Sequence, residues 1–382
     1  MATVGGAATL ATAEGAGTPR AATKASPAVF DVLSDSAEIG RFHGHTTPVL
    51  SLSYSPQANL LLTGGDDETI RLFDTRTRSH ISAFQSADWL PSPVRAVALS
   101  PDGTRAFIAA RENVVKCVRL GGPQGNENDR PMRFEGHEHW IRSLSLNWEA
   151  RRLVTAANDA SLRIWDIESG DEIRRINLGS RGVSVAVKGR FIAVGSHSPV
   201  VRMFALDDDL APPREFTGHT DWVTSVSIGE RLLLSGSADT TARVFDLDSQ
   251  ECLHVLRGHT HTINAVAMCS SEKRAVTGAN DSSVIYWSLD NGGAPLIRIS
   301  SNFGSVRAVT FLRTPNEVCF SGWDGSIRVY DLHHMDRMRI LAICSAGHER
   351  LGKGSTIRKL VHRDLLTKIR GYMYMTAATS EL

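Results

Sequence analysis

A short pattern recurs along the chain and restricts the folds that it can adopt. Full copies occupy residues 64–74, 156–166, 236–246, 278–288 and 321–331, and two weaker copies occupy 109–119 and 195–205. The aligned turn positions are 67, 112, 159, 198, 239, 281 and 324, so the repeat length is roughly 40 residues. Seven units of this length indicate a repeat architecture in which neighbouring units bury one another.

Gly-His dipeptides precede four of the full copies, at Gly44-His45, Gly136-His137, Gly218-His219 and Gly258-His259. Alternating apolar residues soon follow each of them, which predicts short strands. The combination resembles the WD40-repeat family, and the resemblance covers about residues 38 to 343. It implies an all-β fold, a seven-bladed WD40 β-propeller, in which each blade is a small antiparallel sheet.

The resemblance also implies a hydrogen-bond network within each blade. The network joins the imidazole of Gly-His, a Ser or Thr of the second strand, the turn Asp and a Trp of the third strand. The matching residues are His45, Asp67, His137, Thr155, Asp159, Trp165, His219, Ser235, Asp239, His259, Thr277, Asp281, Trp287 and Asp324. Phe73 and Phe245 replace Trp, so two networks lose an indole donor. Because the His and Asp recur once per blade, we interpret them as structural and expect no catalytic residue.

Two segments compete to close the seventh blade. An N-terminal strand at 38–42 precedes the first Gly-His, and 338–344 also has the pattern of an outer strand. We favour the N-terminal strand, because propellers of this family usually close in that way.

The two ends of the chain differ in composition from the repeats, which gives a domain prediction of 1–29, 30–344 and 345–382. Residues 1–29 are rich in Ala, Thr and Gly, so we expect a disordered tail, with an organelle transit peptide as a less favoured interpretation. Apolar residues at helical spacing and an excess of bases predict a basic amphipathic helix in 345–382. It either packs on the propeller, docks to a partner or lies on a membrane surface. The bases expected to meet a partner are Arg358, Lys359, Arg363 and Lys368.

The resemblance implies that partners meet the top face, formed by the starts of the first strands and the turns before the Asp. The predicted partner-binding residues there are Trp140, Trp222, Trp323, Arg95, Arg142, Arg307, Asn264 and Arg111. In the fourth unit we expect Gly182 just before the first apolar position and Ser184 on the rim of the central channel. Arginine binds carboxylates and phosphates in bidentate fashion, which favours an acidic or phosphorylated peptide as ligand.

Composition excludes several classes of function. There are 42 basic and 41 acidic residues, so no global field attracts nucleic acid or anionic lipid. The chain lacks a glycine-rich phosphate-binding loop, a nucleophile elbow and a metal-spaced His and Cys cluster, so we expect no enzyme, cofactor or metal. Five scattered cysteines and no apolar run long enough to span a membrane favour an intracellular protein of the cytoplasm or nucleus.

The expected function is that of a non-enzymatic protein-interaction scaffold, a subunit of a larger complex. One alternative is a substrate receptor of a cullin-RING ubiquitin ligase. Such receptors often carry Trp-Asp-x-Arg, which Phe73-Asp74-Thr75-Arg76 resembles except for Phe. Another alternative is an RNA-associated propeller subunit that uses the basic helix and the arginine rim.

Overall fold

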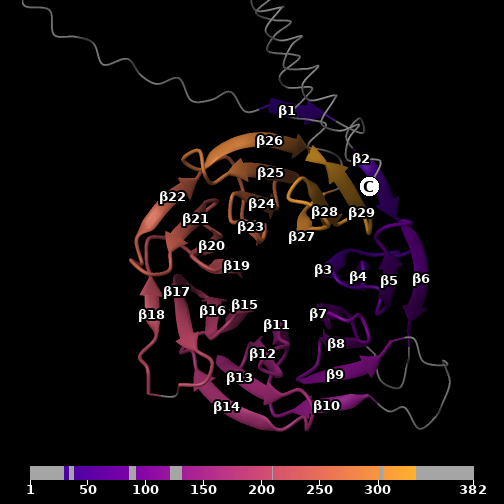
Figure 1. The fold of residues 1–382 in the computed structure, drawn as a ribbon, viewed down its shortest axis with the longest axis vertical. Coiled ribbons are helices and arrows are strands. Elements are labelled where there is room, and N and C mark those ends of the chain that lie inside the picture. The colour runs from indigo at the N-terminus through magenta and orange to yellow at the C-terminus, as the bar shows by residue number, and fades with distance from the viewer. Residues whose placement is uncertain are drawn as a thin grey trace, which may run out of the picture.

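The computed structural model describes residues 30–33, 38–85, 92–120, 131–208, 210–300 and 304–332. Within these ranges the chain forms seven sheets around a central opening (Figure 1). The described chain is therefore a seven-bladed, all-β propeller, as the repeat predicts. The predicted tail at 1–29 and the predicted helix within 345–382 lie outside the described residues.

Each blade contains four antiparallel strands, of which the first faces the channel and the fourth lies on the outer side (Figure 1). Blade one contains β3 (Val49–Ser55), β4 (Leu60–Gly65), β5 (Ile70–Asp74) and β6 (Ser79–Phe84). Blade two contains β7 (Val94–Leu99), β8 (Arg105–Ala110), β9 (Val114–Arg119) and β10 (Met132–Glu135). Blade three contains β11 (Ile141–Asn147), β12 (Arg152–Ala157), β13 (Ser161–Asp166) and β14 (Glu172–Asn177).

The remaining blades repeat this arrangement. Blade four contains β15 (Gly182–Lys188), β16 (Phe191–Ser196), β17 (Ser198–Ala205) and β18 (Arg214–Phe216). Blade five contains β19 (Val223–Ile228), β20 (Leu232–Ser237), β21 (Ala242–Asp246) and β22 (Cys252–Leu256). Blade six contains β23 (Ile263–Met268), β24 (Arg274–Ala279), β25 (Ser283–Ser288) and β26 (Ala294–Ser300). Blade seven contains β27 (Val306–Phe311), β28 (Glu317–Gly322), β29 (Ile327–Asp331) and β2 (Glu38–Phe42).

An N-terminal strand closes the ring. β2 pairs antiparallel with β29, and Phe42 lies opposite Ile327. The prediction that 38–42 completes the seventh blade is confirmed, and the competing segment 338–344 lies outside the described residues. A strand that the sequence did not predict, β1 (Phe30–Leu33), pairs in parallel with β26 and gives blade six a fifth strand.

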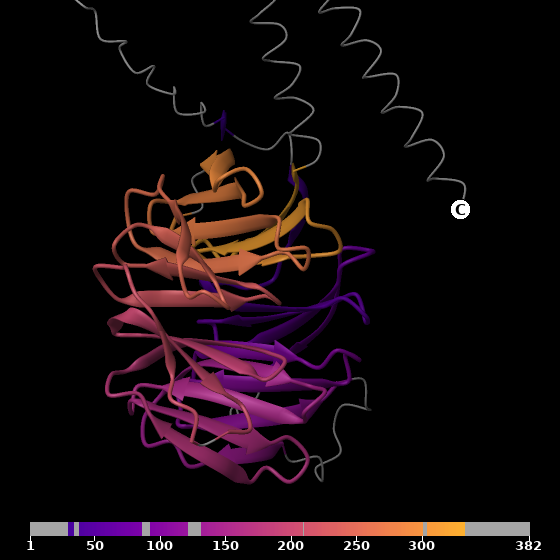
Figure 2. The same cartoon turned by 60° about the vertical axis from the view of Figure 1, so that its left-hand side comes forward.

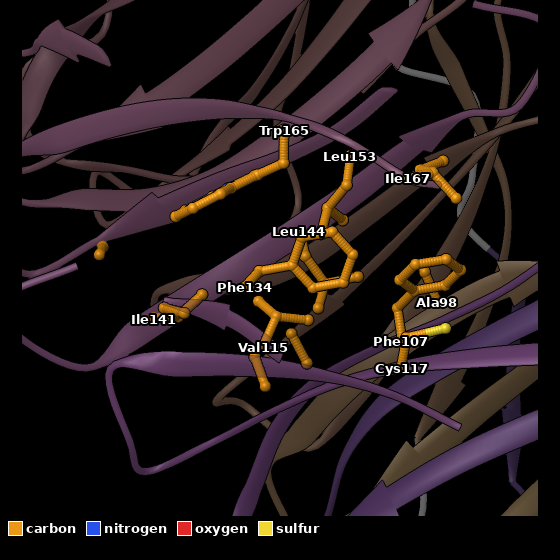
Figure 3. Close-up of a cluster of buried hydrophobic side chains, with 13 residues drawn as sticks. Ala98, Phe107, Val115, Cys117, Phe134, Ile141, Leu144, Leu153, Trp165 and Ile167 are labelled. Carbon is orange, nitrogen blue, oxygen red and sulfur yellow. The ribbon is translucent and has the colours of Figure 1, made fainter. Parts of the chain in front are cut away.

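Apolar side chains fill the space between neighbouring blades, whose twisted sheets are stacked around the ring (Figure 2). Between blades two and three, Phe134 lies between Phe107 and Trp165, with its ring centre 6.0 Å from each of theirs (Figure 3). Trp165 and Leu153 are fully buried there. Since burying one large apolar side chain contributes roughly 1.5 to 3 kcal/mol, these contacts between blades stabilise a ring whose single blades could not stand alone.

Side-chain size is matched across the inner ends of the blades. A methyl group added at Gly64 would lie 2.5 Å from Val94 Cγ1, and the corresponding distances in the pairs Gly195–Val223, Gly236–Ile263 and Gly278–Val306 are 2.8, 2.7 and 2.4 Å. In each pair a second-strand glycine makes room for the branched residue that opens the next blade. Blade three has Ala156 at the glycine position, and blade four opens with Gly182, where an added methyl would lie 2.9 Å from Ala156 Cβ.

Because the small residue and the branched residue are replaced by Ala156 and Gly182 here, the register predicted for blade four is wrong. Gly182 pairs with Ser196 just as Val223 pairs with Ser237, so Gly182 itself occupies the first apolar position. Arg181 then precedes it, and Val183 takes the rim position that was assigned to Ser184. The Ser184 hydroxyl instead accepts a hydrogen bond from the Val226 amide at 3.1 Å, which ties blade four to blade five. The prediction was wrong by one residue because Gly182 is not recognisable as an apolar position.

Candidate binding site at the channel mouth

Backbone hydrogen bonds bring two kinds of loop together on one face of the ring. The Asn158 amide donates to the Trp140 carbonyl at 3.0 Å, and the Ala238 amide donates to the Trp222 carbonyl at 2.9 Å. The residue that precedes a first strand therefore lies beside the residue that follows the second strand of the same blade. We call the surface made by these loops and by the adjoining ends of the first strands the top face.

The His and Asp residues lie beneath this face in closed hydrogen-bond chains. In blade three, Trp165 Nε1 donates to Thr155 Oγ1 at 2.9 Å, and Thr155 Oγ1 lies 2.7 Å from His137 Nε2. His137 Nδ1 lies 2.8 Å from Asp159 Oδ2, so the ring donates to the carboxylate and accepts from the threonine hydroxyl. His137 is buried, and its partners use both ring nitrogens, which suits a staple between strands.

The other blades keep this chain to different extents. Blade six has the full set, with Trp287 Nε1 donating to Thr277 Oγ1 at 2.9 Å and His259 joining Thr277 to Asp281. Blades one and five join their histidines to the turn aspartates and to a second-strand hydroxyl, with buried Phe73 and Phe245 in place of the indole. In blade seven, Asp324 accepts instead from Ser326 and Arg328.

The network shifts the pKa values of its own members. Burial alone would raise the pKa of Asp159, but hydrogen bonds from Ser161, the Glu138 amide and His137 outweigh burial and hold that pKa at about 2. Asp239 is held at about 2 in the same way. Burial lowers the pKa of His137 and His219 despite their aspartate partners. Both histidines therefore favour the neutral form, which fits a structural role.

Five arginines gather at the mouth of the channel. Arg95, Arg142 and Arg307 are half-buried at the second positions of β7, β11 and β27, and Arg111 and Arg181 are exposed on neighbouring loops. Burial lowers the pKa of Arg95 to about 10, and the charges of Arg111, Arg142 and Arg307 act in the same direction. The pKa of Arg142 and that of Arg307 are also lowered, first by burial and then by neighbouring arginines. The guanidinium groups are thus close enough to repel one another.

These arginines differ from the ion-paired arginines elsewhere in the propeller. Away from the mouth several arginines face carboxylates, as in Arg105–Glu168 at 3.2 Å and Arg202–Glu215 at 3.0 Å. At the mouth, Arg111 lies 3.8 Å from Asp66, whereas no carboxylate of the described residues forms an ion pair with the rest of the group, namely Arg95, Arg142, Arg181 and Arg307. The Nε atoms of Arg95 and Arg307 are buried without a hydrogen-bond partner among these residues. Such cations remain available to an anion from outside.

Exposed aromatic rings border the arginines. Trp140, Trp222 and Trp323 are 43%, 50% and 53% exposed. Arg111 lies over the Trp140 ring at 5.8 Å, and Arg307 lies over the Trp323 ring at 4.6 Å. The planes of Trp222 and His197 are parallel, with ring centres 4.0 Å apart. All three predicted tryptophans therefore stand on the top face, where aromatic and arginine side chains alternate in the manner of interface hot spots.

One sector of the mouth is closed by its own hydrogen bonds. Asn264 Nδ2 donates to Asn280 Oδ1 at 2.7 Å, to Ser305 Oγ at 3.1 Å and to the Val306 carbonyl at 2.8 Å. Thr224 Oγ1 donates to the Gly236 carbonyl at 2.9 Å. Asn264, which the sequence grouped with the partner-binding residues, thus has its amide hydrogens engaged within the propeller. The free hydrogen-bonding capacity of the mouth lies with blades two to four and with Arg307.

Further predictions concern the C-terminal segment, metal binding and membrane crossing. The bases predicted on the C-terminal helix, Arg358, Lys359, Arg363 and Lys368, lie outside those residues. Among the described side chains no group of three or more His, Cys, Asp and Glu is placed to hold a metal ion. Within the same ranges no helix has the length and apolarity that a membrane crossing requires.

Sequence comparison agrees with this architecture. The family model described as WD domain, G-beta repeat matches residues 36–74, 129–166, 211–246 and 250–288. Each segment begins with the outer strand of one blade and continues through the first three strands of the next, and these next blades are one, three, five and six, which carry Gly-His. Four repeat matches in a ring of seven blades define the class: the chain belongs to the WD40-repeat β-propellers.

Curated relatives share this class at low identity. The chain is similar to a WD repeat-containing protein WDS homolog of Arabidopsis thaliana, with 24% identity over 70% of this chain and 52% of the relative. It is also similar to a guanine nucleotide-binding protein subunit beta-1 of Nicotiana tabacum (26% identity, 62% of this chain and 55% of the relative). A third relative is autophagy-related protein 16 of Arabidopsis thaliana (24%, 66% and 50%). The chain thus spans about half the length of these relatives. The WD40 repeats support the role of a protein-interaction scaffold, which is typically non-enzymatic.

Proposed function

We propose that this propeller is a non-enzymatic subunit of a larger complex and that its top face binds an acidic or phosphorylated segment of a partner protein. The observation that carries the proposal is the group of arginines at the channel mouth that have no carboxylate partner among the described residues. Half-buried cations that repel one another raise the free energy of the unbound protein, and an anion from a partner would lower it. The neighbouring tryptophans supply apolar contact for the rest of the segment.

The relatives support the scaffold part of this proposal. Guanine nucleotide-binding protein subunit beta-1 is, by its name, a subunit of an assembly. Sequence identity below 30% supports a shared fold but does not support a shared binding partner. The class of partner is therefore inferred from the chemistry of the channel mouth alone.

Affinity purification with crosslinking mass spectrometry tests the proposal. The full chain is compared with an Arg95→Gln, Arg142→Gln, Arg307→Gln variant, and Arg105→Gln is the matched control because Arg105 is ion-paired with Glu168 away from the mouth. We expect the triple variant to lose partners that crosslink to the top face while the control keeps them. Retention of every partner by a folded triple variant would contradict the proposal.

The same purification distinguishes the alternatives. Loss of partners only on deletion of residues 345–382 would place recognition in the C-terminal segment. Co-purification of a ubiquitin-ligase adaptor that disappears with Arg76→Ala would support a substrate receptor. Salt-sensitive recovery of RNA that depends on residues 345–382 would support an RNA-associated propeller.

A further inference from the structure

The charge at the channel mouth exceeds what one carboxylate can balance. Among the described residues, Asp66 is the one carboxylate that forms an ion pair with Arg95, Arg111, Arg142, Arg181 or Arg307, and it pairs with exposed Arg111 at 3.8 Å. The charge of Asp66 also raises the pKa of Arg95 and Arg307 but does not bring either group back to its ordinary value. The mouth therefore has a strong local excess of positive charge in a protein that is nearly neutral overall.

We propose that the mouth binds one phosphorylated serine or threonine side chain of a partner peptide between Arg95, Arg142 and Arg307, and that the stacked rings of Trp222 and His197 contact the peptide residue beside it. This inference rests on the proposed function of the top face and specifies its ligand.

The number of donors favours a phosphoryl group over a carboxylate. Each guanidinium offers five N–H donors in a rigid fork. A phosphoryl group brings about −1.5 to −2 charges and three acceptor oxygens, whereas a carboxylate brings one charge and two oxygens. Three guanidiniums around one point can each give two parallel bonds to neighbouring oxygens only if three oxygens are present. The dianion also offsets more of the mutual repulsion of the arginines.

The depth of the arginines favours a single side chain over a nucleic acid. Arg95, Arg142 and Arg307 are half-buried at the second positions of β7, β11 and β27, which line the channel, and their charges act on one another, so we expect one anionic group to reach all three. A polynucleotide needs a basic track that follows several phosphates. Toward blades five and six the rim instead offers Ala238, Thr224 and the closed Asn264 network, which provide no cation.

The aromatic pair lies next to this anion site. The His197 amide donates to the Arg181 carbonyl at 3.0 Å, and burial, followed by the charges of Arg142 and Arg181, lowers the pKa of His197. Trp222 remains half exposed although one face of its ring is stacked on His197. A flat, partly apolar surface beside a cluster of arginines fits the residue that neighbours a phosphorylated side chain in an extended peptide.

Peptide binding to the full chain tests the inference. A library with fixed phosphoserine or phosphothreonine and randomised neighbours selects a probe, which is then synthesised again with Ser and with Glu at the fixed position. Fluorescence polarisation measures the dissociation constant of each peptide. We expect the phosphorylated probe to bind at least about tenfold more tightly than its Glu version and the Ser version not to bind measurably.

Three variants locate the binding site of the phosphorylated probe. Arg142→Gln is expected to lower its affinity at least about tenfold, and Trp222→Ala at least about threefold, while Arg105→Gln leaves it unchanged. Inorganic phosphate at millimolar concentration should compete, which shows that the phosphoryl group is what the arginines hold. On binding, the imidazole proton resonance of His197 is expected to titrate at higher pH, because the added negative charge relieves its repulsion by Arg142 and Arg181.

The outcomes separate the inference from the proposed function. Equal affinity for the Glu and phosphorylated probes, both lost in Arg142→Gln, overturns the phosphoryl inference and leaves an acidic-segment reader. An affinity unchanged by Arg142→Gln overturns both proposals, as does the absence of any selected peptide. Tighter binding of a 20-nucleotide RNA than of the phosphorylated probe, lost in Arg142→Gln, overturns both in favour of an RNA ligand.

Discussion

At the residue scale, the buried indoles of Trp165 and Trp287 distinguish two blades from the rest. Each indole donates to a threonine that in turn contacts a buried histidine, so one hydrogen bond orients the next. In blades one and five phenylalanine fills the same position, and the chain of donors begins at the hydroxyl. The third-strand residue therefore decides how much polar support a blade adds to its apolar contacts.

Trp165→Phe is expected to destabilise the propeller by about 1 to 3 kcal/mol, because Thr155 loses a donor and a small cavity forms among Phe134 and Leu153. Urea denaturation followed by circular dichroism measures the change. Trp140→Phe is the control, since that ring is exposed and should alter stability by less than about 0.5 kcal/mol. Equal stability of the wild type and Trp165→Phe would show that the indole hydrogen bond contributes nothing.

Acid is expected to unfold the propeller in two stages. The pKa values of His137 and His219 are lowered in the folded state, so the unfolded chain takes up protons first and stability falls as pH drops below about 6.5. Asp159 and Asp239 have folded-state pKa values of about 2 and ordinary values of 3.8, so their contribution is present above about pH 4 and lost between about pH 4 and 2. Urea midpoints measured from pH 8 to 3 check this; a midpoint constant from pH 7 to 5 would contradict the histidine stage.

Single residues also show where the sequence is informative. The recurring His, Asp and Trp residues predict the hydrogen-bond chains within the blades, because each residue type has a fixed chemical part in that network. The position of Gly182 was mispredicted, because it carries no side chain and its role follows from Ala156 in the neighbouring blade. The engagement of Asn264 by Asn280 and Ser305 depends on two other loops, so no local pattern reveals it.

At the element scale, the outer strand of blade seven comes from the opposite end of the repeats. β2 covers Ile327 and Val329 with Phe42, which is 2% exposed, and its backbone completes the ladder on β29. The sequence predicts this strand because it directly precedes the first Gly-His. β1 could not be predicted, since its four residues carry no repeat motif and pair in parallel with a distant blade.

Truncation separates the two N-terminal strands. A chain that begins at residue 38 is expected to unfold within a few degrees of the full chain, because β2 and the seventh blade are intact. A chain that begins at residue 43 loses the burial of Phe42 and exposes the edge of β29, which is expected to cost at least about 3 kcal/mol. Thermal unfolding by calorimetry measures both, and equal melting temperatures would show that β2 does not close the ring.

At the scale of the whole molecule, the arginines at the channel mouth favour ligand binding but lower the stability of the unbound propeller. Half-buried like charges destabilise the unbound ring, and the rest of the propeller tolerates them because its contacts between blades are extensive. The ring was predictable from the repeat period, and the arginines from their aligned positions. That Arg95, Arg142 and Arg307 have no carboxylate partner among the described residues was not predictable, because ion pairing depends on how neighbouring blades are placed.

The Arg95→Gln, Arg142→Gln, Arg307→Gln variant is therefore expected to be more stable than the wild type, by about 0.5 to 2 kcal/mol, although it loses ligands. Chemical denaturation at low and high salt measures this gain, which should shrink at high salt as the repulsion is screened. A triple variant less stable than the wild type would indicate that these side chains hold the ring together.

Closure by β2 also constrains how the protein is made. Glu38 contacts Tyr330, a residue 292 positions further along the chain. At translation rates of about 5 to 20 residues per second, β2 leaves the ribosome about 15 s to one minute before its partner strand exists. Throughout that interval the nascent blades present unpaired edges and an unsealed seam, so cotranslational chaperones have a defined period in which to protect this chain.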